Sequence, residues 1–232
     1  MNLLSEIRDS LLHLIHPVIC CGCGSELPGK EGQLCIRCME SLPETRFEHL
    51  GGNPVEKKFW GRLPVQVAAA HYYFSRETLI QHLVHELKYK GNRDIGLQLG
   101  KIMGDTLMKS GRFLIDALVP LPLFPAREKK RGYNQASVLC EGIAASLKVP
   151  VLKDIVLRSH HTETQTRKGR IERWQNMAGK FVLRNPDSVR NRHVLLVDDV
   201  ITTGATLEAC GAELLKAEGL QLSIATLCYA AH

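Results

Sequence analysis

The sequence contains no low-complexity tract, no internal repeat and no long apolar segment. No stretch reaches the about 18–20 apolar residues needed to cross a bilayer, so membrane insertion is not expected. The N-terminus, MNLLSEIRDSLLHLIHPVICC, also lacks the uninterrupted apolar core of a secretory signal, because Glu6, Arg8 and Asp9 interrupt it. Its leucines and isoleucines have helical spacing, which predicts an amphipathic helix. Without a signal peptide or a membrane span, the protein is expected to be cytoplasmic.

A phosphate-binding loop of the GxxxxGK[ST] type is also missing. Residues 24–31, GSELPGKE, come close to this pattern, but Glu31 stands where a Mg²⁺-binding hydroxyl is required. The segment also lies between cysteine pairs rather than between a strand and a helix. These two differences exclude a P-loop site at this position.

The composition is that of an ordinary globular protein, with 44% hydrophobic and 23% charged residues among 232. This length suffices for one domain with a full core and a small accessory module. The net charge is +6, and basic residues gather in REKKR (127–131) and between Val156 and Arg184. Such segments suit an anionic ligand, either a phosphorylated small molecule or a nucleic acid, although a solvated charged surface has the same composition.

Four of the eight cysteines form two CxxC pairs separated by eleven residues, Cys20–Cys23 and Cys35–Cys38. In a reducing compartment, two such pairs favour a metal over disulfides, and four thiolates form the tetrahedral shell of structural zinc. An iron–sulfur cluster is the main alternative. Cys21 could replace Cys20 only by leaving a one-residue spacer. The remaining cysteines lie in apolar patterns, where burial is expected.

The rest of the chain alternates strand and helix patterns. We expect residues 1–50 to hold the N-terminal helix and zinc module, 51–64 to be a linker, and 65–232 to form the main domain. Strands are predicted at 65–74, 116–122, 154–157, 180–183, 193–199 and 222–230, and helices at 76–89, 94–108, 134–147 and 206–218. This order predicts an α/β fold with a mainly parallel central sheet flanked by helices.

The stretch VLLVDDVITTGAT (194–206) joins a buried strand to a helix. Ligands of open α/β sheets bind beyond the carboxyl ends of the strands, where Asp198 and Asp199 are expected. The free amides of a helix N-terminus, with nearby threonine hydroxyls, form a phosphate site, and Gly204 permits the tight turn. Carboxylates bind hydroxyl groups or Mg²⁺. Together these groups fit a ribose 5-phosphate, although acids that cap the turn and threonines that cap the helix are an alternative.

VLLVDDVITTGAT resembles the signature of type I phosphoribosyltransferases, which bind phosphoribosyl pyrophosphate (PRPP). From Cys20 to the C-terminus, the chain resembles the ComF/GntX family, which joins an N-terminal zinc module to a phosphoribosyltransferase domain and is associated with DNA uptake in bacteria. The resemblance also rests on the segments LKYKGNRDIG, VPLPLFPAREKKRGYNQA and QTRKGRIERWQNMAGKF. It implies a type I phosphoribosyltransferase-like fold with a small N-terminal zinc module of four cysteines.

The resemblance also implies roles for individual residues. Asp198 and Asp199 would contact the ribose hydroxyls. The 5′-phosphate would be bound by Thr202, Thr203, Gly204, Ala205 and Thr206.

In type I enzymes the loop after a strand such as 116–122 contacts pyrophosphate. Arg127 and Arg131 are the candidates there, with Lys88 and Lys90 as weaker ones, because an arginine fork matches phosphate oxygens well. Residues 158–176 would form a mobile loop that closes over PRPP, in which His160 and His161 are expected to be exposed rather than acid–base groups.

Two functions are consistent with these features. In the first, a nitrogen nucleophile attacks the anomeric carbon of Mg²⁺-bound PRPP and pyrophosphate leaves, with Asp198, Asp199, Arg127 and Arg131 as the catalytic residues. In the second, the protein is a non-catalytic PRPP sensor or adaptor that binds single-stranded DNA or a competence helicase. Few aromatic residues lie beside the basic segments to stack on bases, namely Tyr89, Tyr133 and Trp174.

Overall fold

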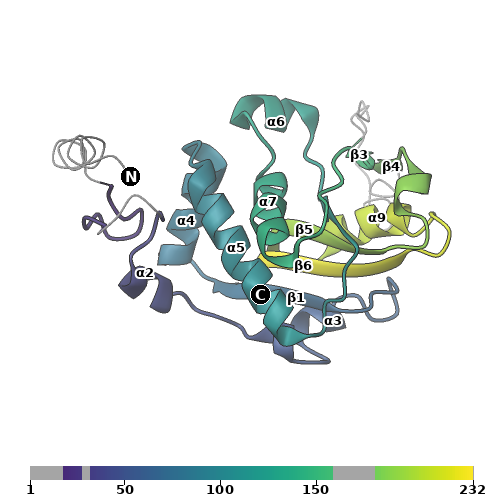
Figure 1. Cartoon of the computed structure of the whole chain (residues 1–232), viewed down its shortest axis with the longest axis horizontal. Coiled ribbons are helices and arrows are strands. Elements are labelled where there is room, and N and C mark those ends of the chain that lie inside the picture. Colours follow the sequence, from purple (N-terminus) through teal and green to yellow (C-terminus); the bar gives the residue numbers. More distant parts are fainter. Residues whose placement is uncertain (1–17, 28–31, 159–180, 232) are drawn as a thin grey trace, which may run out of the picture.

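The computed structural model describes residues 18–27, 32–158 and 181–231 (Figure 1). Its centre is a four-stranded parallel sheet. The strands in spatial order are β1 (Ala68–Phe74), β6 (Gln221–Ala230), β5 (His193–Ile201) and β2 (Ala117–Pro120). A separate antiparallel pair consists of β3 (Val156–Arg158) and β4 (Phe181–Leu183). The predicted mainly parallel sheet is therefore confirmed.

Helices flank this sheet (Figure 1). Their bounds are α2 (Ile36–Glu40), α3 (Pro54–Lys57), α4 (Leu79–Tyr89), α5 (Arg93–Ser110), α6 (Pro125–Arg131), α7 (Gln135–Leu147) and α9 (Ala205–Leu214). Two 3-10 turns are η1 (Phe47–His49) and η2 (Pro186–Val189). The predicted helices match α4, α5, α7 and α9, whereas α2, α3 and α6 were not predicted. No helix in the described ranges is long and apolar enough to span a bilayer.

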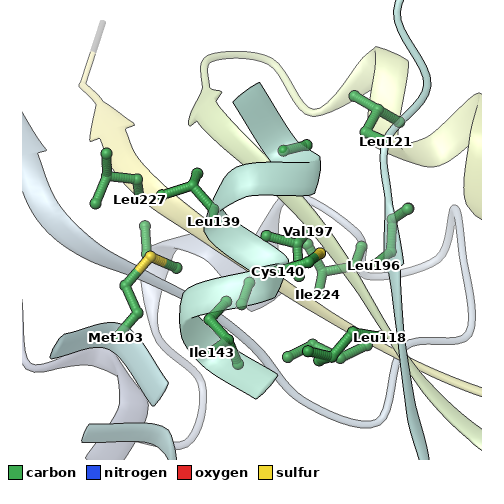
Figure 2. Packing of buried hydrophobic residues seen from close by; sticks show 14 of the residues in the cluster. Met103, Leu118, Leu121, Leu139, Cys140, Ile143, Leu196, Val197, Ile224 and Leu227 are labelled. Atoms are coloured by element: carbon green, nitrogen blue, oxygen red, sulfur yellow. The ribbon is translucent and has the colours of Figure 1, made fainter. Parts of the chain in front are cut away.

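The apolar run Val194–Val197 is buried at every residue. Successive strand residues point to opposite faces, so both faces of β5 are covered, as expected for an interior parallel strand. Figure 2 shows part of this core, where side chains of α5 and α7 meet those of the strands. Each fully buried large aliphatic side chain stabilises the fold by roughly 1.5–3 kcal/mol. Cys140, Cys210 and Cys228 are buried here, as predicted.

Residues 51–64, predicted as a linker, are folded and packed. Pro54–Lys57 form α3, and Val55, Phe59 and Leu63 are at most 6% exposed. Only Val55 lies in α3; Phe59 and Leu63 lie in the turns that follow it, where the Leu63 N–H donates to the Phe59 carbonyl at 3.0 Å. The glycines, proline and charges of this segment had predicted a linker, but its apolar side chains pack into the core.

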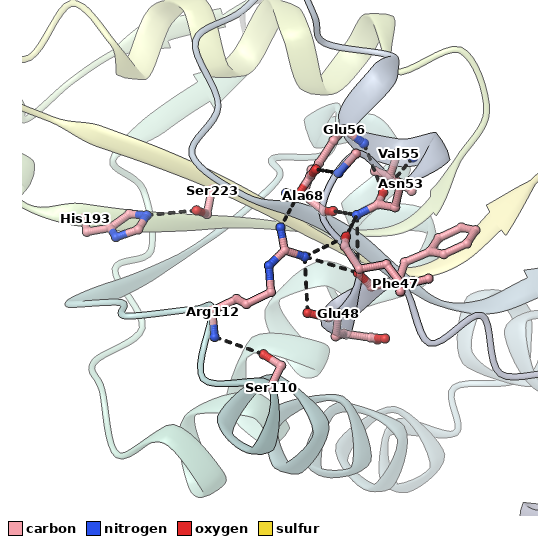
Figure 3. A network of polar contacts seen from close by, with 12 residues as sticks. Phe47, Glu48, Asn53, Val55, Glu56, Ala68, Ser110, Arg112, His193 and Ser223 are labelled. Atoms are coloured by element: carbon pink, nitrogen blue, oxygen red, sulfur yellow. Dashed lines mark hydrogen bonds and ion pairs between the residues drawn. The ribbon is translucent and has the colours of Figure 1, made fainter.

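A polar network holds the same segment against the end of α5 (Figure 3). The Arg112 guanidinium donates to the Leu50 carbonyl at 2.7 Å and to Glu56 Oε1 at 2.7 Å. The Asn53 amide donates to the carbonyls of Leu50 and Ala68 at 2.9 and 2.8 Å. Because these backbone carbonyls all have partners, the segment is fixed relative to β1.

Two predictions fall outside the described residues. They concern the N-terminal amphipathic helix and the loop that contains His160 and His161.

Candidate functional site

Asp198 and Asp199 lie near the carboxyl end of β5, which continues to Ile201. Asp198 is in register with Thr226 of β6, and Ile201 with Tyr229. Both aspartates are half-buried residues, and the side chain of Asp199 is 13% exposed. The structure therefore brings the two acids to the edge of the sheet at which open α/β proteins bind ligands.

Lys88, in the last turn of α4, forms an ion pair with Asp199. Its Nζ lies 2.9 Å from Asp199 Oδ1, and the two side chains are 19% and 13% exposed. The Tyr133 hydroxyl donates to the Leu87 carbonyl and so holds this turn of α4 in place. The sequence made Lys88 a weaker candidate for pyrophosphate binding; its pairing with Asp199 was not predicted, because no spacing rule links a residue of α4 to the end of β5.

Asp198 has a different environment. Burial, and then the negative charge of Asp199, raise the pKa of Asp198 to about 8. The Asp199 N–H, which donates to Asp198 Oδ1 at 2.8 Å, opposes this shift, as do the charges of Lys88 and Arg158. The two adjacent acids therefore differ, since Asp199 is paired with a cation while Asp198 favours its protonated form near neutral pH.

The turn after β5 leads into the N-terminus of α9. Gly204 caps the helix with a φ of 81°, a left-handed conformation that suits glycine. The Glu208 N–H donates to the Gly204 carbonyl at 2.8 Å, and the Ala205 N–H lies 3.4 Å from the Thr203 hydroxyl oxygen. The amides of Thr206 and its successor precede the first intrahelical bond, so they can bind an anion.

Phe59 packs beneath this turn. A Cβ added to Gly204 would lie 3.3 Å from two Phe59 ring atoms. The Arg62 guanidinium also forms an ion pair with Glu208 in the first turn of α9. The segment predicted as a linker thus supports the candidate phosphate turn.

The two arginines predicted for pyrophosphate are both in α6, but they point to different neighbours. Arg127 Cζ lies 5.8 Å from the centre of the Phe124 ring. Arg131 stacks over Tyr89 at 5.3 Å and donates to Gln135 Oε1 at 2.6 Å. Arg131 is therefore engaged by α4 and α7, whereas Arg127 lies beside Phe124.

A third arginine, Arg158 at the end of β3, was missed by sequence reasoning. Its Cζ lies 3.8 Å from the centre of the Phe124 ring. Burial, and then the positive charge of Arg127, lower the pKa of Arg158, and the charge of Asp198 opposes this. In the sequence Arg158 only begins a long polar stretch, and nothing there indicates a neighbouring carboxylate.

The four cysteines of the two CxxC pairs converge. Their Sγ atoms all lie within 4.8 Å of one another, with Cys23 and Cys35 3.8 Å apart. A tetrahedral shell with a Zn–S length of about 2.3 Å requires S–S distances of about 3.8 Å. The N–H groups of Gly22 and Cys35 also approach Cys20 Sγ at 3.4 and 3.3 Å. This donor set fits structural zinc.

Cys21 lies outside this cluster and connects it to the main domain. Its thiol donates to Gln33 Oε1 at 3.2 Å, and the Asn92 amide donates to its sulfur at 3.2 Å. The Cys21 carbonyl lies 3.0 Å from His82 Nε2 of α4. Burial raises the pKa of the Cys21 thiol.

Comparisons with known proteins agree with this geometry. The family description "Phosphoribosyl transferase domain" matches residues 134–232. Competence protein F of Haemophilus influenzae is 31% identical over 211 residues, covering 90% of this chain and 89% of that protein. DNA utilization protein YhgH of Escherichia coli K12 is 30% identical over 222 residues, covering 94% and 92%.

Among solved structures, glutamine PRPP amidotransferase from B. subtilis, complexed with ADP and GMP, has a TM-score of 0.41 and 17% identity. The match covers 60% of this chain and 30% of that enzyme. The similarity to Competence protein F extends along nearly the whole of both proteins. The chain therefore belongs to the ComF family and contains a phosphoribosyltransferase-like domain.

Proposed function

We propose that this protein binds PRPP at the carboxyl end of β5 and transfers the 5-phosphoribosyl group to a nitrogen acceptor, with release of pyrophosphate. The observation that carries the proposal is the pairing of two half-buried aspartates with a glycine-capped helix N-terminus a few residues further along the chain. Acids for hydroxyl groups and amides for a phosphate match the two ends of a ribose 5-phosphate. The phosphoribosyltransferase match over this region supports it.

In this proposal Asp198 and Asp199 bind the ribose 2′- and 3′-hydroxyls. The 5′-phosphate lies in the turn of residues 202–206, where the helix amides and the hydroxyls of Thr202 and Thr203 donate to it. Both threonines are exposed. Fixing the sugar at both ends orients its anomeric carbon toward the acceptor, which is the main contribution a site without a covalent nucleophile can make.

The charge that develops on pyrophosphate needs neutralisation. Mg²⁺ bound with PRPP would supply positive charge to the leaving group, and the oxygens of Asp198 and Asp199 are the hard donors that suit it. Arg127 and Arg131 are the α6 cations proposed for the same group. Lys88 offsets the charge of Asp199 before the substrate arrives. The four-cysteine cluster is proposed to hold a structural zinc ion.

Calorimetric titration with PRPP and Mg²⁺ tests this proposal. Wild type should bind, and Asp198→Asn with Asp199→Asn should weaken binding at least about tenfold, as expected for the loss of charge-assisted hydrogen bonds. Asp116→Asn is a matched control, because this carboxylate accepts from the His193 N–H at the amino end of β5. Equal PRPP affinity in the double variant would refute the proposed site.

Turnover is a separate measurement. Incubation with PRPP, Mg²⁺ and a panel of nucleobases should release pyrophosphate with at least one acceptor, and Asp199→Asn should abolish the release. If the protein binds PRPP but releases no pyrophosphate with any acceptor in the panel, the result favours a PRPP sensor over an enzyme.

Nucleic-acid binding is a second candidate function. Lys129 and Lys130 are exposed on α6, and Arg131 stacks on Tyr89, which is 62% exposed. Exposed cations beside an aromatic ring are the elements of a single-strand site. The names of the relatives, which refer to competence and DNA utilization, agree with this.

Fluorescence anisotropy with a labelled single-stranded oligonucleotide tests the second candidate. Binding should weaken as salt rises and should be lost in Lys129→Glu with Lys130→Glu. The matched control is Lys101→Glu with Lys109→Glu, two exposed lysines of α5. Failure of wild type to bind at low salt, or equal losses in both double variants, would exclude a site on α6.

A further inference from the structure

Among the residues that the structure describes, Arg158 has no hydrogen-bonded or ion-paired side chain as a partner. It ends β3, beside β4 and α9, and is half-buried. Its Nε is buried and has no hydrogen-bond acceptor, and no carboxylate pairs with it among the residues that the structure describes. Arg112, by contrast, is bonded to several carbonyls and to Glu56. A buried guanidinium donor without an acceptor lowers the stability of the fold. An arginine kept in this position despite that cost indicates that a ligand binds to it.

Two phenylalanines fix the direction of this guanidinium. Arg158 Cζ lies 3.8 Å from the centre of the Phe124 ring, which precedes α6, and 5.2 Å from that of Phe181, which begins β4. Stacking on aromatic faces holds the planar group without using its N–H donors. This stacking leaves the two terminal amino groups of the guanidinium, rather than the buried Nε, to donate to a ligand.

Arg127 reaches the same aromatic ring. Its Cζ lies 5.8 Å from the centre of the Phe124 ring, so two guanidinium groups share one side chain. Like charges this close repel each other, and the charge of Arg127 lowers the pKa of Arg158. The charge of the Asp198 carboxyl raises the pKa of Arg158, and β3, which ends at Arg158, packs against α9 beside the candidate phosphate turn. A multiply charged anion between the two arginines would offset both charges.

We propose that Arg158, with Arg127, binds the pyrophosphoryl group of PRPP and is a catalytic residue for its departure. This inference rests on the proposed phosphoribosyl transfer. When the bond between C1 of the ribose and the pyrophosphate oxygen breaks, its electron pair leaves with that oxygen. The lone pair of the acceptor nitrogen forms the new bond to C1, and the nitrogen loses a proton to solvent. The two guanidiniums face the charge that pyrophosphate gains.

Arg158 is an addition to the two arginines, Arg127 and Arg131, that the resemblance implied for pyrophosphate. Arg131 is already held by Gln135 and by the ring of Tyr89. In the described part of the chain Arg158 Nε has no hydrogen-bond partner, and the charge of Arg158 opposes the raised pKa of Asp198.

Titration of the zinc-loaded full chain with three probes tests the inference. The probes are ribose 5-phosphate, magnesium pyrophosphate and PRPP with Mg²⁺. Arg158→Gln should bind ribose 5-phosphate within about twofold of wild type, but pyrophosphate and PRPP at least about tenfold more weakly, the effect of losing a charge-assisted contact. Arg190→Gln is the control, since Arg190 pairs with Glu218 away from the sheet's carboxyl edge. Equal pyrophosphate affinity in Arg158→Gln would overturn the inference.

A measurement on wild type avoids dependence on how the variant folds. Phenylglyoxal labels accessible arginines, and mass spectrometry identifies them. Pyrophosphate should protect Arg158 from labelling and ribose 5-phosphate should not; protection by neither would overturn the inference. The proposed function fails separately, and the inference with it, if wild type binds neither ribose 5-phosphate nor PRPP.

Discussion

Lys88 Nζ lies 2.9 Å from Asp199 Oδ1, which joins the last turn of α4 to the carboxyl end of β5. Both side chains are mostly buried, so this pair is screened less by solvent than a surface ion pair. The charge of Asp199 is therefore offset by Lys88. The pKa of Asp198 is raised to about 8, so this acid favours its protonated form near neutral pH. A ligand that carries several negative charges can then approach two acids at a lower electrostatic cost.

Lys88→Met should weaken PRPP binding by about tenfold or more, because Asp199 would then face the phosphates without its cation. The same change should lower the free energy of unfolding by about 1–3 kcal/mol, since it leaves a mostly buried carboxylate unpaired. Lys88→Met combined with Asp199→Asn should recover the stability but not the affinity. Chemical denaturation and calorimetry measure the two effects. PRPP affinity that rises in Lys88→Met would show that the lysine only blocks the site.

Asp198→Asn should stabilise the protein at alkaline pH. The folded-state pKa of Asp198 is raised from its ordinary value of 3.8 to about 8. Between these values the folded state holds a proton that the unfolded state has lost, so wild-type stability falls as pH rises through this window. Asparagine does not titrate. The gain in the free energy of unfolding should therefore be small near about pH 4 and should grow, on the order of 1–3 kcal/mol, by about pH 8.

The readout is the difference in urea midpoint between Asp198→Asn and wild type across this pH range. Asp116→Asn serves as the control, because Asp116 accepts from the His193 N–H at the other end of β5. A difference that shrinks toward alkaline pH would contradict the raised pKa.

Local pattern predicted the α/β alternation and the interior position of β5. Val194–Val197 form a continuous apolar run, and such runs occur in strands covered on both faces. The glycine-capped turn between β5 and α9 was also predictable, since Gly204 and the neighbouring threonines directly follow the strand. The CxxC spacing likewise predicted the cysteine cluster that the structure assembles.

The contacts that complete the site were not predictable, because they join residues far apart in the chain. Lys88 meets Asp199, and Arg158 and Arg127 share Phe124, only through the packing of α4, α6 and β3 around the sheet edge. Residues 51–64 were predicted as a linker from their glycines, proline and charges. The burial of Phe59 against the turn before α9 depends on tertiary packing, which these residue types do not indicate.

Gly204→Ala tests whether the turn before α9 binds phosphate. Alanine at a φ of 81° is strained, and its Cβ would lie 3.3 Å from the Phe59 ring. We expect a loss of about 1–2 kcal/mol in stability and at least about tenfold weaker ribose 5-phosphate binding. Gly111→Ala has a similar φ of 66° at the end of α5 but no atom within 4 Å of the added Cβ. It should lose stability without losing affinity. Unchanged affinity in Gly204→Ala would argue against a phosphate in this turn.

The last prediction concerns the metal content of the four-cysteine cluster. Purified protein should contain about one zinc ion per chain, and Cys38→Ser should release it, because a four-sulfur shell tolerates the loss of a thiolate poorly. Cys21→Ser is the matched control, since the Cys21 sulfur bonds to Gln33 and Asn92 instead of joining the cluster. It should keep its zinc and nearly its melting temperature, whereas Cys38→Ser should melt several degrees lower. Elemental analysis measures the metal. Iron in place of zinc would support a cluster of iron and sulfur, and equal zinc content in Cys38→Ser and wild type would mean that the ion is bound elsewhere.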